Sequence, residues 1–163
     1  MRSKLTGCLI VLALTGVPVT APAQTQSLAK APAEITHAND LIRREKYAEA
    51  KTVLEGYLKT HAGDRTAAVL LGVADAYAED PAGAAKAFDG AGPIPERYKV
   101  IAAKAYSDAA VNALKEKNYD DAIALSSKAL AIAPNVNVLY IQGTAYTNAQ
   151  RYSQAIPVLE KAK

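Results

Sequence analysis

The stretch KEKNYDDAIALSSKALAIAPN, from Lys115 to Asn135, decides the fold. Its apolar residues recur at helical spacing, and Pro134 ends the pattern because the residue before a proline disfavours the helical region. The helix opens with a Tyr-x-x-Ala motif, and this motif occurs three times, at Tyr119 and Ala122, at Tyr47 and Ala50, and at Tyr152 and Ala155. Three copies in 163 residues indicate that one structural unit is reused.

The helical pattern continues on both sides of this stretch, from residue 34 to the end of the chain. Breaks rich in Gly, Pro and Asp divide it into eight expected helices, at 34–46, 48–60, 65–78, 82–90, 96–117, 120–132, 136–149 and 153–162. No segment alternates apolar and polar residues between hairpin turns. The sequence therefore predicts an all-α fold.

The small residue of the motif recurs at a nearly constant interval. Ala50 and Ala84 are 34 residues apart, and Ala122 and Ala155 are 33 apart. The interval from Ala84 to Ala122 is longer, at 38 residues, and it contains the segment Gly-Pro-Ile-Pro at 92–95. Helix–turn–helix units at this period resemble the tetratricopeptide repeat.

The last two units carry this resemblance most clearly. The final unit has the family's large, small and aromatic residues at Leu139, Gly143, Tyr146, Tyr152, Ala155, Leu159 and Ala162, and the unit before it at Tyr106, Ala110, Tyr119, Ala122, Ala129 and Pro134. Gln142 and Ser126 depart from the family pattern, which has large apolar residues there. The first two units match more weakly, at Ala38, Leu41, Tyr47, Ala50 and Leu54 and at Leu71, Gly72, Ala84 and Phe88.

The resemblance implies a right-handed α-solenoid of about four units, at 31–64, 65–98, 103–135 and 136–163. Small residues such as Gly143 are expected where two helices cross, and large ones such as Leu159 beside the crossing. A single helix pair cannot bury both of its apolar faces, so neighbouring pairs stack. The residues expected to pack the repeats are Tyr119, Ala122, Ala129, Pro134, Gly143, Tyr146, Tyr152, Ala155 and Leu159.

The N-terminus has the pattern of a secretory signal peptide over residues 1–23. Arg2 and Lys4 precede an apolar run, and Ala21-Pro22-Ala23 offers a cleavage site. An uncleaved anchor is the alternative, while lipidation at Cys8 is disfavoured because the apolar run lies mostly after it. Residues 24–33 are expected to form a flexible linker before the repeat domain at 34–163. The chain is thus expected in the bacterial periplasm or outside the cell.

Charge and composition exclude several classes of function. Without residues 1–23 the chain keeps 17 of its 19 basic side chains against 16 acidic ones, a net charge of about +1. No basic cluster indicates nucleic acid, and no Cys remains. His37 and His61 stand alone, Asp120 and Asp121 are helix-end charges, and no nucleotide-binding or nucleophile motif occurs. We expect no metal, no cofactor and no catalysis.

The resemblance also implies a concave groove lined by the first helix of each pair. The positions that map to it are Leu70, Val73, Tyr77, Val111, Leu114, Tyr140, Ile141 and Thr144. A mixed groove with an apolar stripe suits an apolar helix face or an extended peptide. The alternative is that the apolar members are ordinary core, because burial and groove exposure give the same sequence signal. Some family members bind a C-terminal carboxylate through Lys, Arg and Asn at fixed groove positions. Leu70 and Ile141 occupy two of these positions here, so a carboxylate site of this kind is not expected.

These observations predict a non-catalytic adaptor or assembly scaffold of the cell envelope that binds another protein. Three alternatives stay open. The last helix could present an open edge and stack on a second copy, the groove could continue in a longer protein beyond Lys163, or an active site could assemble from scattered residues.

Overall fold

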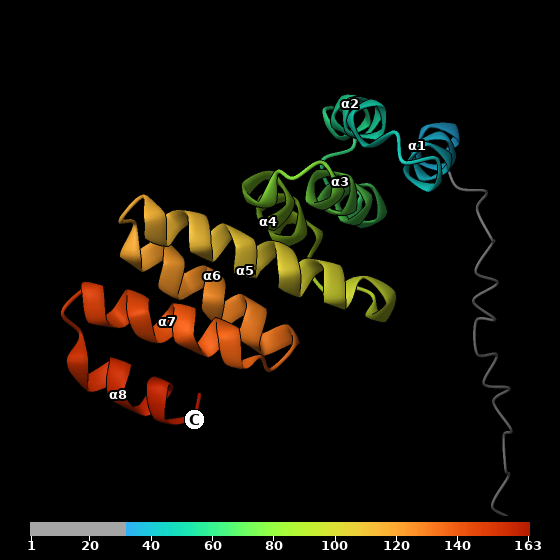
Figure 1. Cartoon of the computed structure of the whole chain (residues 1–163). Coiled ribbons are helices and arrows are strands. Elements are labelled where there is room, and N and C mark those ends of the chain that lie inside the picture. The colour runs from blue at the N-terminus through green and yellow to red at the C-terminus, as the bar shows by residue number, and fades with distance from the viewer. Residues whose placement is uncertain (1–31) are drawn as a thin grey trace, which may run out of the picture. The chain divides into compact units, whose positions relative to one another are not determined.

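The computed structural model describes residues 32–163, and these residues form eight α-helices without a strand (Figure 1). The helices are α1 (Ala33–Arg43), α2 (Tyr47–Leu58), α3 (Arg65–Tyr77), α4 (Pro81–Ala91), α5 (Lys99–Lys115), α6 (Tyr119–Ile132), α7 (Val136–Asn148) and α8 (Tyr152–Glu160). The predicted all-α fold is confirmed, and each helix begins and ends within three residues of its expected bounds. The expected signal peptide and most of the linker lie outside the described residues.

The helices pack as consecutive pairs. Each helix contacts the one before and the one after it, and the first helices of neighbouring pairs also meet, as α1 with α3, α3 with α5 and α5 with α7. In Figure 1, α5, α6, α7 and α8 lie side by side in chain order. This contact pattern is that of a stack of helix hairpins, in which each unit is stabilised by its neighbours.

A small residue and a larger one meet at the same place in the pairs. Ala38 and Leu54 are fully buried in the first pair, and Gly72 and Phe88 are buried in the second. A Cβ on Gly143 would overlap the side chain of Leu159 in the last pair. The small residue lets two helix axes approach, and the larger side chain fills the space beside it.

The turns inside the four pairs share one backbone conformation. A non-glycine residue with a φ of 60–65° follows the first helix of each pair, at Glu45, Glu79, Lys117 and Gln150. The next residue donates its N–H to the carbonyl five positions back, at 2.8–2.9 Å in all four copies, which is the Schellman ending of a helix. The second helix then begins at Tyr47, Pro81, Tyr119 or Tyr152. The backbone conformation of the repeat is therefore preserved even where the residue types differ.

The longer interval between the second and third units contains an extra turn. Gly92, with a φ of +71°, ends α4, and Pro93 to Pro95 lead into a 3-10 helix, η1 (Glu96–Tyr98), that precedes α5. We expected one helix over 96–117, but the 3-10 turn separates its first three residues from α5. Tyr98 packs against the cluster formed by Ile35, Ala38, Leu54, Ala67 and Leu70. The inserted segment thus folds back onto the first two repeats.

The two departures from the repeat pattern are polar residues inside the stack. Ser126 is fully buried on α6, and its Oγ donates to the backbone oxygens of Ala122 and Ile123, 2.7 and 3.0 Å away. Gln142 is buried on α7, and its Nε2 donates to Ser127 Oγ at 2.6 Å. These hydrogen bonds offset the cost of burying a polar side chain. Among residues 32–163, no helix is long and apolar enough to cross a membrane.

Candidate functional site

A surface groove of about 720 Å³ lies between the end of α3 and the length of α5. We call it the α3–α5 groove. Two apolar side chains on its walls are unusually exposed, Tyr77 at 50% and Val100 at 78%. Ile101 and Val111 line it between them and are half-buried. Residues three or four apart on α5 face the same side, so one helix face forms a continuous wall.

Charged residues surround this apolar surface. Lys104 and Asp108 form an ion pair on α5, with Nζ and Oδ2 2.5 Å apart, and both line the groove. Lys115 and Glu79 also line it. The groove therefore combines an apolar wall with both signs of charge, a composition that can position a peptide as well as bury part of it.

Tyr77 is held in place by a residue from the preceding repeat. Its ring stacks on that of Tyr47, with centroids 5.1 Å apart and an interplanar angle of 15°. Stacked rings of this kind contribute about 0.5–1.5 kcal/mol beyond their buried area. Tyr77 is thus both exposed and fixed, so a partner would lose little side-chain entropy in contacting it.

The residues expected to line one groove lie at different places in the structure. Tyr77 and Val111 line the α3–α5 groove. Val73 is buried in the core, which agrees with the alternative interpretation of the sequence. Leu114 is half-buried and packs against the cluster of Ala113, Ala122 and Ala145.

The four other expected groove residues lie elsewhere. Leu70 is buried at the floor of a second cleft. Tyr140 and Thr144 are exposed and Ile141 is half-buried, all on α7, and none of the three lines either cleft. The expected groove residues therefore do not form one continuous surface with the α3–α5 groove.

The second cleft, about 610 Å³, lies between α1, the start of α3 and the inserted segment before α5. We call it the α1–α3 cleft. Ile35 and Leu70 line it from the core, while Arg65 and Arg97 line it from the surface. The sequence alone indicates neither arginine as a site residue. The only feature of the sequence that points to this cleft is the four extra residues between the second and third repeats, because the inserted segment contributes Arg97.

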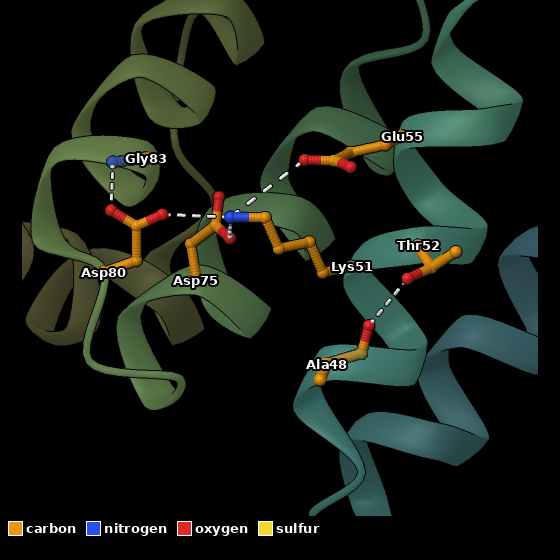
Figure 2. Close-up of polar contacts among 7 residues, drawn as sticks. All are labelled: Ala48, Lys51, Thr52, Glu55, Asp75, Asp80 and Gly83. Carbon is orange, nitrogen blue, oxygen red and sulfur yellow. Dashed lines mark hydrogen bonds and ion pairs between the residues drawn. The ribbon is translucent and has the colours of Figure 1, made fainter.

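A polar cluster joins the first two repeats (Figure 2). Lys51 on α2 points toward Asp75 on α3 and Asp80 at the start of α4, with Nζ 2.8 Å from Asp75 Oδ1 and 2.9 Å from Asp80 Oδ2. Glu55 Oε1 lies 4.0 Å from the same nitrogen. Asp75 is only 2% exposed, and the amine meets its Oδ1 as an ion pair rather than as a well-aligned hydrogen bond.

The two carboxyl groups of this cluster have opposite pKa shifts. Burial raises the pKa of Asp75, and Lys51 only partly offsets that effect. The N–H of Gly83, which donates to Asp80 Oδ1 at 2.9 Å, lowers the pKa of Asp80, and Lys51 lowers it further. Asp80 also caps α4 through this bond. A Cβ on Gly83 would lie 2.5 Å from Asp80 Oδ2, so a larger residue here would displace the Asp80 carboxylate.

Further polar contacts join the later repeats. Asp89 on α4 accepts hydrogen bonds from Tyr106 Oη at 2.8 Å and from Lys128 Nζ at 2.7 and 2.8 Å, which links α4, α5 and α6. Arg151 and Asp120 form an ion pair of 2.7 Å between the turn before α8 and the start of α6. Burial, with the hydrogen bond to Asp89, raises the pKa of Tyr106. These groups hold repeats together, and each carboxylate has a cationic partner, as expected of structural contacts.

Comparison with known proteins finds one family model and several solved structures that match this chain. Residues 35–96 match the family model described as tetratricopeptide repeat. The fold resembles a solved structure titled MamA AMB-1, with a TM-score of 0.55 and 18% sequence identity, over 79% of this chain and 69% of that chain. No curated protein matches the sequence.

Proposed function

We propose that this chain, which matches the tetratricopeptide repeat model over residues 35–96 and has the fold of a solved structure, is a non-catalytic scaffold that binds a partner protein in the α3–α5 groove. The observation that carries the proposal is the exposure of Tyr77 and Val100 over a groove of about 720 Å³. Exposed apolar side chains gathered at a concave surface are typical of interaction sites. The occupant that fits is the apolar face of a helix or an extended apolar segment.

The energetics favour Tyr77 and Val100 as the main contacts. Burying an exposed apolar side chain stabilises a complex by about 25 cal/mol per Å² of area removed from water. Tyr77 is already ordered by its stack on Tyr47, so its burial carries a small entropic cost. Lys104, Asp108 and Lys115 would orient the partner more than they would add affinity.

A cross-linking experiment tests the groove. A photoreactive residue at Val100 would capture the partner in the native cell, and one at Val136, which is also exposed but lies on α7, serves as the control. The captured protein would then be purified and titrated with the wild type, Val100→Ser and Val136→Ser. We expect Val100→Ser to weaken binding about tenfold, corresponding to 1.4 kcal/mol, and Val136→Ser to leave it unchanged. Equal affinities for all three proteins would disprove a role for the groove.

The proposed site of action is the bacterial cell envelope. Support comes from the N-terminal sequence, where a basic start, an apolar run and Ala21-Pro22-Ala23 form the pattern of an exported protein. Fractionation of the native host, followed by N-terminal sequencing, tests it. We expect a periplasmic chain that begins near Gln24. A cytoplasmic chain that retains Met1 would contradict the proposal.

Self-association is the second candidate function. Tyr152 and Ile156 are both more than half exposed on α8. The equivalent position to Tyr152 in the first repeat, Tyr47, is covered by the ring of Tyr77 from the next repeat. A second copy could cover Tyr152 in the same way. Light scattering over a concentration series would show a dimer that Ile156→Ser dissociates, whereas a monomer at all concentrations would remove this candidate.

A further inference from the structure

We infer that the α1–α3 cleft binds an acidic segment of a partner protein, at a site separate from the α3–α5 groove. Two guanidinium groups line this cleft, Arg65 at the start of α3 and Arg97 in η1, and no Asp or Glu is among its lining residues. An excess of cations at the rim of an apolar cleft attracts carboxylates. The two residues are distant in sequence and line the same cleft because the inserted segment folds back onto the first two repeats.

Arg65 is held in a fixed orientation without being neutralised. Its Nε donates to the backbone oxygen of Ala91 at 3.0 Å, and its Nη2 donates to that of Pro93 at 3.2 Å. Both acceptors are neutral carbonyls, so the positive charge of the guanidinium persists. A planar guanidinium that is already oriented loses less entropy when it binds a carboxylate.

Arg97 is likewise placed by an uncharged neighbour. Its guanidinium carbon lies 4.7 Å from the centroid of the Tyr98 ring, which is within the range of a cation–π contact. Most basic side chains that reach across this fold are instead paired with acids, as Lys51 is with Asp75 and Lys128 with Asp89. The nearest acid in sequence, Glu96, pairs with Lys99 at 2.7 Å. The two arginines of the cleft therefore remain available for an external carboxylate.

The cleft also has an apolar lining. Ile35, Val69 and Leu70 line it and are almost completely buried in the free protein. Pro95 and Tyr98 form the opposite side. A volume of about 610 Å³ accommodates a short piece of peptide rather than a folded domain. The chemistry that fits is an Asp or Glu side chain next to an apolar side chain.

Other anionic partners fit less well. Nucleic acid requires many phosphate contacts along an extended basic surface, and this cleft offers two cations. Membrane binding through charge requires a cluster of four to eight basic residues. A terminal carboxylate is also not required, because side-chain carboxylates offer the same bidentate acceptor.

Peptide selection tests the inference. Short random peptides, flanked at both ends by fixed residues so that no free C-terminus is presented, would be selected on the full-length protein and on three variants. Arg97→Gln removes one cation of the cleft. Lys59→Gln, at an exposed lysine after α2, is the charge-matched control, and Val100→Ser alters the α3–α5 groove. The best peptide and its counterpart with Gln and Asn in place of Glu and Asp would then be titrated.

We expect Asp and Glu to be enriched in peptides selected on the wild type, Lys59→Gln and Val100→Ser, and not in those selected on Arg97→Gln. The selected peptide should bind at least about tenfold more tightly than its amide counterpart, and added salt should weaken it. No acidic enrichment, or enrichment that persists in Arg97→Gln, would overturn the inference. Loss of the enrichment in Val100→Ser would overturn it too, by assigning the peptide to the other groove. The protein would also be titrated with vesicles of phosphatidylglycerol. Binding to these vesicles without binding to any selected peptide would assign the cleft to lipid and reject a peptide.

Discussion

Gly72 lies against the ring of Phe88 where α3 crosses α4, so closely that a Cβ on Gly72 would lie 2.9 Å from three ring carbons. Gly72→Ala should therefore destabilise the fold, because the ring is buried and cannot move aside. We expect a loss of about 1–2 kcal/mol, after the gain in helix propensity is subtracted from the cost of overpacking. Urea unfolding followed by circular dichroism measures it.

Gly56 provides the matched control for this change. It lies inside α2, and a Cβ there would meet nothing within 4 Å. Gly56→Ala should stabilise the protein by up to about 1 kcal/mol through helix propensity alone. Equal effects of the two substitutions would mean that the crossing of α3 and α4 is looser than the structure shows.

The turn residues with positive φ give a second prediction. Lys117 has a φ of 65°, a conformation that costs a residue with a Cβ about 1–2 kcal/mol and glycine almost nothing. Lys117→Gly should raise the free energy of unfolding by about 0.5–1 kcal/mol, since glycine also loses more entropy on folding. Glu116→Gly, at a φ of −76°, should instead lower it. Thermal unfolding of the two variants should thus shift in opposite directions, and a shared direction would contradict the turn geometry.

Lys51→Met should destabilise the first two repeats. It leaves Asp75 buried without its cation, while the side chain of Lys51 is partly exposed, so we expect about 2 kcal/mol rather than the 3–5 kcal/mol of a fully buried pair. Lys59→Met, at an exposed lysine, is the control and should change stability little. The measurement is urea unfolding at neutral pH, and a loss no larger than the control's would show that the cluster contributes nothing.

The same variant should have a distinct pH dependence. Lys51 is the group that lowers the pKa of Asp75, so its removal raises that pKa further above the value in the unfolded chain. A raised pKa means that the folded protein binds the proton first, so stability is gained as the pH falls through it. Wild-type Asp80, with its lowered pKa, loses stability over the acidic range. The gap between wild type and Lys51→Met should therefore be smaller at pH 5 than at pH 8, and a larger gap at pH 5 would contradict this account.

Gln142→Leu should stabilise the last two repeats. Gln142 is buried where the repeat pattern has a large apolar residue, and its amide gains only one side-chain hydrogen bond, to the exposed Ser127. Leucine has nearly the same volume and no polar atoms to desolvate, so we expect a gain of about 1 kcal/mol. Ser127→Ala, which removes the partner alone, should destabilise by a similar amount. A loss of stability in Gln142→Leu would show that the hydrogen bond outweighs the desolvation.

The sequence was sufficient to predict the helices, because their signals are local. The breaks at Gly63, Pro81, Pro134 and Gln150 stop one helix and start the next in the structure as in the pattern. The sequence indicates an irregularity at residues 92–95, but it does not indicate that Tyr98 folds back onto the first two repeats. The members of the cluster that Tyr98 packs against lie 28 to 63 positions before it, and nothing local to Tyr98 specifies them as its partners.

The candidate sites were less predictable for the same reason. Val73 and Val111 have the same residue type and comparable places in their helices, yet Val73 is buried and Val111 lines a groove. The difference depends on which neighbour covers each helix. Asp75 was recoverable, because it is the only charged residue after Arg65 within α3, among apolar and small residues. Its partner Lys51 was not, since a partly exposed lysine on α2 has no distinguishing signal in the sequence.

The four turns with positive φ also provide positions from which distances between the repeats can be measured. Glu45, Glu79, Lys117 and Gln150 are exposed, lie one repeat apart and occupy equivalent positions. The sequence holds a single Cys, at position 8, so cysteines introduced at these turns would take spin labels almost without background. The distances between pairs of labels would then give the spacing of the repeats along the stack. They would report whether the protein bends, and between which repeats, when a groove is filled.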